Sequence, residues 1–463
     1  MNDMKKNIRK IFWLYFALFL SLVLYLGYFV LIDSKNIVST VYNPRINIIR
    51  NDIKRGTIYD TNGETLAESI REGEGYRRFY AHDSLFAHIV GYSDISKSGI
   101  EAKNNFDLLN IDFEIVKRIN NLITGDELEA GSVHLTIDLE LQKVAAKALG
   151  NTNGSVVAIE PSTGRILSMY SSPGFNPNTI SENWDILRQD TENNPLLNRA
   201  SQGLYPPGSV FKLVMAKAIM ENIQDYENFY YECTGEFVYE NSRIRCHNLS
   251  GFGRVNLHDA IKYSCNTYFA NASLILGEET IINTAERLYF NKSLNFDLEQ
   301  VESRFSLTIG SDTSEIIETS IGQGRTVSTP LHMALLAATI ANDGKMQTPY
   351  VFDYLTTSRG NIRNVTTPKT MDTLFTLEET EELKEMMRVA VESGTGSNAK
   401  SSFVEIAGKT GTAQTDFDES HGWFVSFAPV DNPVIAICVM TENTGNSRLA
   451  TTVTKTMIEH YVK

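Results

Sequence analysis

The sequence has few cysteines and no excess of positive charge. Only four cysteines occur among 463 residues, too few for the disulfide framework that stabilises small secreted domains. Lysine and arginine number 42 against 56 aspartates and glutamates, so the formal net charge is −14. The sequence contains no internal repeat and no long low-complexity tract. These absences argue against a nucleic-acid-binding protein, a disulfide scaffold and a repeat protein.

Charge is also missing from a long segment near the start. Residues 11–32 contain no charged side chain over 22 positions, enough to cross a hydrocarbon core of about 30 Å. Residues 1–10 carry a net charge of +3, so the −14 of the whole chain leaves −17 for the remainder. A cleaved signal peptide is the alternative, but the run is too long and no small-residue cleavage site follows. We expect an anchor at 11–32, a cytoplasmic tail at 1–10 and an extracytoplasmic remainder of a single-pass cell-membrane protein.

A candidate nucleophile lies at the start of a predicted buried helix. Prolines and a glycine at 206–208 prevent a helix before Ser209, and the apolar run at 213–219 favours one after it. Lys212, three residues further, lies on the same face of the first turn. A neutral lysine amine can take the proton of a serine when burial or a second cation lowers its pKa. Ser-x-x-Lys alone is too short to identify an active site.

Two further motifs follow it along the chain. Ser264-Cys265-Asn266 begins 55 residues after Ser209, and Lys409-Thr410-Gly411-Thr412 begins 145 residues after Ser264. Each alone has a structural explanation, since a serine can cap a helix and Lys-Thr-Gly is a common turn. In the order Ser-x-x-Lys, Ser-x-Asn, Lys-Thr-Gly they resemble the motifs of penicillin-binding enzymes. The chain is identified as a member of the class B penicillin-binding proteins, serine peptidoglycan transpeptidases that penicillin acylates.

The segment after the predicted anchor supports the resemblance. Residues 55–63 match the Arg-Gly-x-Ile-x-Asp-x-Asn-Gly signature that opens the ectodomain of class B enzymes, and single-chain β-lactamases lack it. Within it, residues 60–63 predict a turn between two short strands, and residues 41–49 alternate as a strand does. We expect a small non-catalytic pedestal at 33–130 and a transpeptidase domain at 131–463.

The predicted order of elements gives the fold class. Strands at both ends of 131–463 with helices between them indicate an α/β fold, a mostly antiparallel sheet sandwiched by helices, as in the penicillin-binding and serine β-lactamase-like family. A Ser-Gly-Thr-Gly sequence at 393–396 ends one of the helices. Strands are expected at 133–138, 154–160, 165–170, 403–412, 422–428 and 434–440, and helices at 139–149, 256–277 (two), 333–340, 377–391 and 451–461.

The resemblance implies acyl transfer by the first two motifs. Ser209 attacks the carbonyl of the penultimate D-alanine of a peptidoglycan stem peptide, releases the terminal D-alanine and passes the acyl group to the amine of a neighbouring stem peptide. Lys212 is the expected base. Ser264 and Asn266 complete a hydrogen-bonded path for the proton. Lys409 adds positive charge that keeps Lys212 neutral and attracts the substrate carboxylate.

The third motif is expected to bind substrate. Thr410 and Thr412 offer hydroxyls to the substrate carboxylate, and Gly411 leaves room for the substrate backbone to pair with the strand. In the family, the oxyanion hole uses the N–H groups of the nucleophile and of the residue after the glycine, here Ser209 and Thr412. Catalysis is expected to need no cofactor.

Three cysteines fall within 33 residues. Some class B enzymes carry a structural zinc in this segment, and the resemblance places ligands at Cys246 and Cys265. Cys233 would supply a third thiolate and His258, or alternatively His247, the fourth ligand. A disulfide between Cys233 and Cys246 and three free thiols are the other possibilities.

Two other functions remain open from the sequence. With water as the acceptor, the acyl-enzyme would belong to a D,D-carboxypeptidase or β-lactamase, although no glutamate that positions water is evident. A non-catalytic β-lactam sensor or cell-wall scaffold is the second alternative, although no motif residue is missing. Residues 33–130 are too few for a glycosyltransferase domain. The resemblance to class B enzymes therefore implies a separate membrane-embedded glycan polymerase as partner.

Overall fold

The computed structural model describes residues 2–28, 54–73, 75–109, 130–240, 242–357, 359–414 and 419–463. Helix α1 (Asn2–Tyr28) contains a segment, Met4–Tyr28, that is long and apolar enough to cross a membrane. It includes most of the predicted anchor. Residues 29–32 of that anchor and the strand expected at 41–49 lie outside the described residues.

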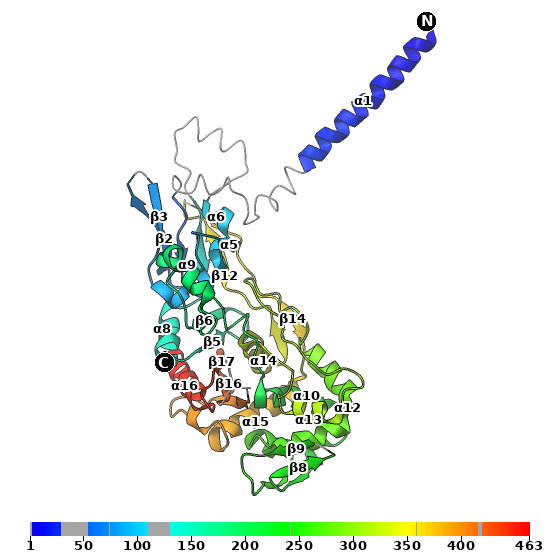
Figure 1. The fold of residues 1–463 in the computed structure, drawn as a ribbon, viewed down its shortest axis with the longest axis vertical. Helices are drawn as coiled ribbons and strands as arrows, with labels where there is room; N and C mark the ends of the chain where they lie inside the picture. The colour runs from blue at the N-terminus through cyan, green and yellow to red at the C-terminus, as the bar shows by residue number, and fades with distance from the viewer. Residues whose placement is uncertain are drawn as a thin grey trace.

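A six-stranded sheet, called the pedestal sheet below, lies at one end of the molecule (Figure 1). Its order is β13-β12-β4-β1-β2-β3, in which β1 and β2 pair antiparallel around the predicted turn at 60–63. Strand β4 pairs parallel with β1, although the sequence favours it as the start of the catalytic part. The sheet thus takes strands from both sides of residue 130, namely β1 (Ile58–Tyr59), β2 (Thr65–Glu72), β3 (Gly75–Tyr80), β4 (Ser132–Leu135), β12 (Phe352–Thr356) and β13 (Ile362–Arg363).

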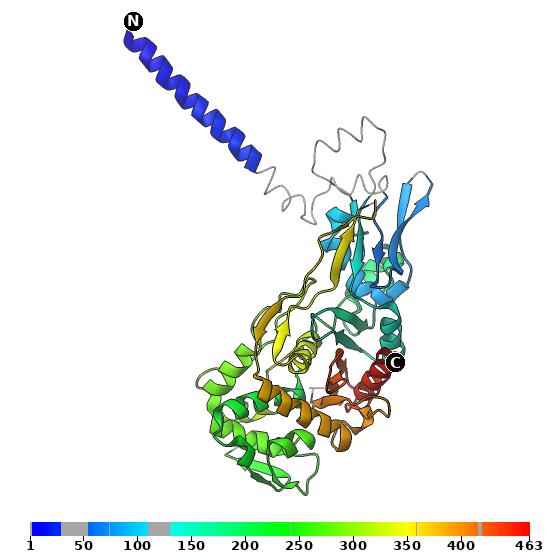
Figure 2. The same cartoon turned by 180° about the vertical axis from the view of Figure 1, so that it is seen from behind.

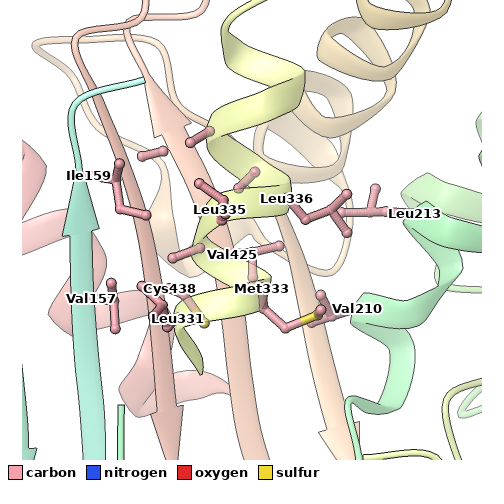
Figure 3. Packing of buried hydrophobic residues seen from close by; sticks show 14 of the residues in the cluster. Val157, Ile159, Val210, Leu213, Leu331, Met333, Leu335, Leu336, Val425 and Cys438 are labelled. Carbon is pink, nitrogen blue, oxygen red and sulfur yellow. The ribbon is translucent and has the colours of Figure 1, made fainter. Parts of the chain in front are cut away.

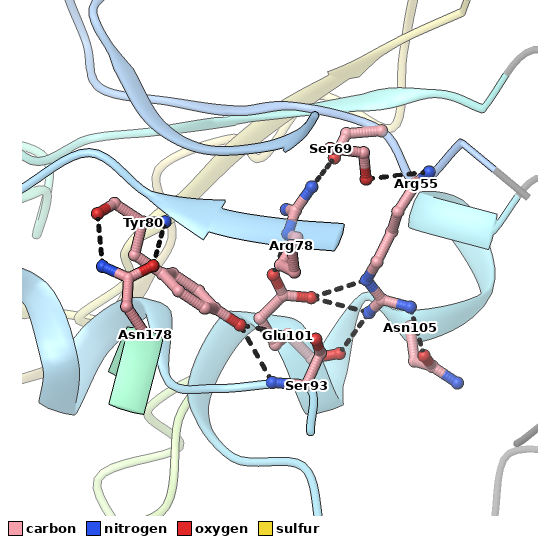
Figure 4. Close-up of polar contacts among 9 residues, drawn as sticks. Arg55, Ser69, Arg78, Tyr80, Ser93, Glu101, Asn105 and Asn178 are labelled. Carbon is pink, nitrogen blue, oxygen red and sulfur yellow. Dashed lines mark hydrogen bonds and ion pairs between the residues drawn. The ribbon is translucent and has the colours of Figure 1, made fainter. Parts of the chain in front are cut away.

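A buried ion network ties this sheet to the short helices beside it (Figure 4). Glu101 is 0% exposed, and its two carboxylate oxygens accept hydrogen bonds from Arg55 Nε at 2.7 Å and Arg78 Nε at 2.6 Å. Burial opposes ionisation, but the two guanidinium charges hold the pKa of Glu101 below its ordinary value. The helical segments here are η2 (Asp83–Phe86), α4 (Ala87–Val90), α5 (Gly99–Lys103) and α6 (Asn105–Leu109).

The catalytic part contains a five-stranded sheet in the order β15-β16-β17-β5-β6, and every neighbouring pair is antiparallel. Buried side chains of α8 and α16 pack on one face of it and those of α14 on the other, which confirms the predicted sandwich. The elements are β5 (Gly154–Ile159), β6 (Ile166–Ser172), β15 (Ala407–Ala413), β16 (His421–Ala428), β17 (Ile435–Thr441), α8 (Leu139–Leu149), α14 (Pro330–Ala341) and α16 (Arg448–Tyr461).

Helix α14 lies between this sheet and helix α10 (Lys212–Asn222), as Figure 3 shows. All of its 12 residues are buried, as expected for a helix that is apolar on every side. Leu335 faces Val425 of the sheet, while Met333 and Leu336 face Val210 and Leu213 next to the predicted nucleophile. The core therefore fixes the start of α10 relative to the sheet.

Among the remaining elements, the segments at 212–287 and 313–320 lie at the end of the molecule opposite the six-stranded sheet (Figures 1 and 2), whereas Asn178 at the start of residues 177–189 bonds to Tyr80 of β3. Two helices flank Ser264 as predicted, although the second runs past Gly277, where the backbone is not helical. These elements are η3 (Pro177–Thr179), α9 (Ile180–Gln189), η4 (Gly208–Phe211), η5 (Tyr226–Asn228), β7 (Tyr231–Cys233), β8 (Glu236–Tyr239), β9 (Ser242–Arg245), β10 (Gly253–Val255), α11 (Leu257–Lys262), α12 (Asn266–Arg287), α13 (Thr313–Ser320), β11 (Lys345–Gln347), β14 (Thr370–Thr373), α15 (Leu377–Ser393) and η6 (Ser397–Ala399).

Replacing Glu101 by glutamine is expected to lower the free energy of unfolding by about 3–5 kcal/mol, because two buried guanidinium groups lose their counter-charge. Chemical denaturation of the detergent-solubilised protein at pH 7 would measure it. The matched control is Glu72→Gln, whose exposed pair with Arg77 contributes at most about 1 kcal/mol. Equal stabilities of the two variants would contradict the interpretation.

The difference in free energy of unfolding between the wild type and Glu101→Gln should depend on pH. Because the pKa of Glu101 is lowered in the folded state, its contribution is fully present above the pKa of an unfolded glutamate, about 4.3. The contribution is lost as the pH falls through the folded-state value. The gap between wild type and Glu101→Gln should therefore be constant from pH 6 to 7 and narrow in acid.

Candidate active site

Ser209 lies in η4, the 3-10 turn that leads directly into α10, as the sequence predicts. The preceding Gly208 has φ of +53°, and its N–H donates to the carbonyl of Gly322 at 2.9 Å. A Cβ on Gly208 would stand 2.7 Å from the carbonyl oxygen of Thr412. Only glycine fits at position 208. Because it has no side chain, the turn that contains Ser209 can pack directly against strand β15.

Lys212 is 0% exposed, and its amine is held by the second motif. The Nζ atom donates to Asn266 Oδ1 at 2.6 Å, to the carbonyl of Ser264 at 2.8 Å and to Ser264 Oγ at 3.2 Å. Burial lowers the pKa of Lys212 to about 8, although negative charge on Cys265 or Cys246, in their thiolate forms, raises it. At that pKa about a tenth of the amine is neutral at pH 7.

Lys409 is also 0% exposed and reaches the same hydroxyl. Its Nζ donates to Ser264 Oγ and to the carbonyl of Thr410, both at 3.0 Å. Burial, and then the charge of Lys212, lower the pKa of Lys409 well below its ordinary value. Burial is the main cause of the lowered pKa of Lys212, and the repulsion between the two amines that the sequence suggests lowers the pKa of Lys409.

The backbone at the second motif places both polar groups of Ser264 toward the amines. Ser264 has φ of +54°, a left-handed conformation that is unfavourable for a residue other than glycine. The next helix begins at Asn266, whose side-chain nitrogen donates to the carbonyl of Arg245 at 2.7 Å. That bond directs the amide oxygen of Asn266 to Lys212.

The third motif forms most of β15, the edge strand of the five-stranded sheet. A Cβ on Gly411 would stand 2.9 Å from Val210 Cγ2 and 3.0 Å from the carbonyl of Pro207. The glycine therefore allows the strand to approach the turn of Ser209. The Thr412 side chain is exposed, whereas Thr410 is 6% exposed and its hydroxyl donates to Thr395 Oγ1 at 2.7 Å.

Comparison with known proteins agrees with this geometry. Residues 154–459, more than half of the chain, match the family described as the penicillin-binding protein transpeptidase domain. The chain is a class B penicillin-binding protein. Residues 55–133 of this penicillin-binding protein match a second family, the penicillin-binding protein A dimerisation domain.

Individual relatives resemble the penicillin-binding protein over most of its length. It is 31% identical to the peptidoglycan D,D-transpeptidase PbpA of Mycolicibacterium smegmatis, over 89% of this chain and 88% of the relative. It is 31% identical to MrdA of Acinetobacter baumannii, over 83% of this chain but only 66% of the relative. The structure of penicillin-binding protein A from M. tuberculosis, a ceftriaxone acyl-enzyme complex, aligns with a TM-score of 0.83 at 26% identity, over 89% of this chain and 99% of that one.

Three of the cysteines meet directly behind the second motif. The Sγ atom of Cys246 lies 3.8 Å from those of Cys233 and Cys265, and the three ligand atoms lie within 4.8 Å of one another. All three are buried and free, so no disulfide joins Cys233 and Cys246. With zinc–sulfur bonds of about 2.3 Å, two corners of a tetrahedral site are about 3.8 Å apart, which matches the distances from Cys246 to Cys233 and to Cys265.

Neither predicted histidine belongs to this cluster. His258 Nε2 pairs with Glu382 of α15, so its ring is directed to a different helix, and the ring of His247 packs against Phe252. The prediction of His258, or alternatively His247, as fourth ligand is therefore wrong for this structure. The atom that faces all three sulfurs is Thr267 Oγ1, at 3.1 Å from Cys233, 3.3 Å from Cys265 and 3.8 Å from Cys246.

The sequence did not indicate Thr395 as part of the site. The Ser-Gly-Thr-Gly stretch at 393–396 predicts only the end of a helix. A threonine between two glycines was the available signal, because such glycines allow a close approach of the backbone.

Substituting Gly208 by alanine should slow labelling by a fluorescent penicillin by about 10- to 100-fold, because the new Cβ would push the Thr412 carbonyl away from the nucleophile. The control is Gly150→Ala. Gly150 also has a positive φ, of +65°, but no atom lies within 4 Å of the added Cβ. It shares the backbone strain without the clash. Equal labelling rates for the two variants would show that this close approach has no role in the site.

Proposed function

We propose that this chain is a peptidoglycan D,D-transpeptidase whose Ser209 forms an acyl-enzyme with stem peptides and with β-lactams. The observation that carries the proposal is the convergence of two buried amines, from Lys212 and Lys409, on the hydroxyl of Ser264 next to the turn of Ser209. Curated relatives are named peptidoglycan D,D-transpeptidases, and a structural relative forms a β-lactam acyl-enzyme.

In the proposed reaction, neutral Lys212 takes the proton of Ser209 as Ser209 Oγ bonds to the carbonyl of the penultimate D-alanine. The C–N bond to the terminal D-alanine then breaks, and the proton reaches the leaving nitrogen through the hydroxyl of Ser264, which receives one from Lys212 in exchange. The amine of a second stem peptide then attacks the ester carbonyl and gives a proton to Lys212, which returns it to Ser209 Oγ as the bond from Ser209 to the acyl carbon breaks. Asn266 keeps the Lys212 amine in place for both steps.

Strand β15 supplies the proposed binding surface. Lys409, Thr410 and Thr412 donate hydrogen bonds to the substrate carboxylate, and the N–H groups of Ser209 and Thr412 stabilise the oxyanion. An edge strand supports this role because its outer side presents N–H and C=O groups that no neighbouring strand uses. No cofactor takes part in these steps.

A penicillin-labelling experiment tests the mechanism. A fluorescent penicillin should label the wild-type chain, but not Ser209→Ala, and should label Lys212→Ala much more slowly. Since only the neutral amine acts as base, and the pKa of Lys212 is about 8, the wild-type rate should rise about tenfold between pH 7 and pH 9.

The reaction outcome separates the transferase from a hydrolase. With a D-Ala-D-Ala peptide and an amine acceptor, the transpeptidase should yield the aminolysis product. Labelling of Ser209→Ala at the wild-type rate would sink the assignment of the nucleophile. Formation of the hydrolysed peptide alone would instead establish a carboxypeptidase.

We also propose that Cys233, Cys246 and Cys265 bind a structural zinc ion. The support is their burial, the 3.8 Å distances from Cys246 to the other two sulfurs and the hydrogen bond from Cys265, which lowers the pKa of Cys246 and so favours its thiolate. The hydroxyl of Thr267 faces the fourth corner. Because Cys265 lies between Ser264 and Asn266, zinc would stabilise the position of the second motif without entering the reaction.

Metal analysis of the purified protein should find about one zinc per chain and, after Cys246→Ser, much less. The control is Cys438→Ser in β17, which removes a buried thiol outside the cluster and should leave the zinc content unchanged. Chelation should make the three clustered thiols reactive. Full reactivity of these thiols before chelation, with no metal bound, would end the zinc proposal.

We further propose that residues 1–10 lie in the cytoplasm, that the catalytic part lies outside the cell membrane, and that a separate membrane-embedded glycan polymerase binds the anchor and pedestal. The apolar helix at Met4–Tyr28 and the basic residues near its start support this orientation. The partner is inferred from the resemblance to class B enzymes.

Co-purification in detergent tests the partner. The polymerase should be recovered with the full chain and lost when residues 1–130 are deleted. Because that deletion also uncovers β4, a second variant should replace only residues 1–28 by an unrelated membrane helix. An unchanged yield of polymerase with both variants would refute the proposed contact.

A further inference from the structure

One side chain outside the three motifs joins two of them. Thr395 follows α15, and its N–H donates at 3.2 Å to the carbonyl of Lys262, two residues before Ser264. Its hydroxyl accepts the hydrogen bond from Thr410 Oγ1 at 2.7 Å. Thr395 thus contacts the backbone that leads into the second motif and a side chain of the third motif.

The loop around Thr395 is tightly packed. A Cβ on Gly394 would stand 2.4 Å from the carbonyl of Lys262, and a Cβ on Gly396 would stand 3.2 Å from the carbonyl of Ala390. The N–H of Gly396 donates to that same Ala390 carbonyl at 2.9 Å. With both flanking residues held by backbone contacts, the Thr395 hydroxyl has a fixed position relative to β15.

The two hydroxyls can exchange roles when substrate binds. A threonine hydroxyl has one proton to donate and can accept from other donors. In the structure the proton of Thr410 points to Thr395, so Thr410 cannot at the same time donate it to a substrate carboxylate. If the Thr395 hydroxyl is the donor instead, the Thr410 oxygen accepts that hydrogen bond, and the Thr410 hydroxyl can donate its own hydrogen bond to the substrate. Hydrogen bonds in such a chain strengthen one another.

We propose that Thr395 is a positioning residue for carboxylate recognition. Its hydroxyl donates a hydrogen bond to Thr410, while the hydroxyl of Thr410 donates a hydrogen bond to the carboxylate of the substrate or β-lactam. This inference rests on the proposed function, in which Thr410 binds that carboxylate. It assigns to the loop after α15 a role in selecting substrates with a free carboxyl terminus.

The test compares acylation of the full-length protein by a penicillin and by its methyl ester, which lacks the negative charge. Thr395→Val keeps the shape and removes the hydroxyl, and should slow acylation by the penicillin about 5- to 10-fold while changing the ester rate by less than about twofold. Thr395→Ser keeps the hydroxyl and should behave as wild type. In a Thr410→Val background, Thr395→Val should add less than about twofold.

Three results would overturn the inference. The first is that Thr395→Val slows acylation by the penicillin and by its methyl ester equally, and the second is that Thr395→Ser is acylated as slowly as Thr395→Val. The third is that Thr395→Val slows acylation in the Thr410→Val background as much as it does in the wild type. The first and third would assign Thr395 to maintaining the loop. Failure of the proposed function has a different signature, because penicillin would then label Ser209→Ala as fast as wild type.

Discussion

Two lysine amines buried beside one serine hydroxyl are the constraint on which the site depends. Burial of an ammonium group is costly, and the hydrogen bonds described for Lys212 and Lys409 go to hydroxyl, amide and carbonyl oxygens, all of them neutral. Such surroundings favour the uncharged amine. In the proposed reaction, burial makes a lysine able to act as a base near neutral pH, and no histidine is required for that role.

The precision of the site comes from close packing around it. Helix α14 fills the space between the sheet and the nucleophile helix, while Gly208 and Gly411 let β15 approach the turn of Ser209. Trp423 adds a hydrogen bond from its indole N–H to the carbonyl of Pro206 at 3.0 Å. All of these contacts restrict the turn of Ser209 relative to the five-stranded sheet, so Ser209 and strand β15 keep a fixed separation.

The sequence predicted the features that have local causes. Apolar runs and a turn at 161–164 predicted the strands of the five-stranded sheet, helical spacing predicted α8, an apolar run predicted α14, and proline and glycine placement predicted the helix start at Ser209. It missed the features that depend on distant segments. Strand β4 joins the pedestal sheet because β1 and β12 lie on either side of it, and His258 is directed to Glu382 by the packing of α11 on α15. The link from Thr395 to Thr410 likewise needs two segments brought together by folding.

The pedestal sheet and the core of the catalytic part share a mechanical connection. Strand β12 belongs to the pedestal sheet, and only ten residues, 342–351, separate it from the end of α14. The carboxylate of Asp297 clamps the start of that strand by accepting the N–H groups of Val351 and Phe352. A force applied to the pedestal sheet would thus be transmitted through this short, restrained segment to helix α14, which packs against the residues next to Ser209. A small displacement of the sheet would therefore displace that helix.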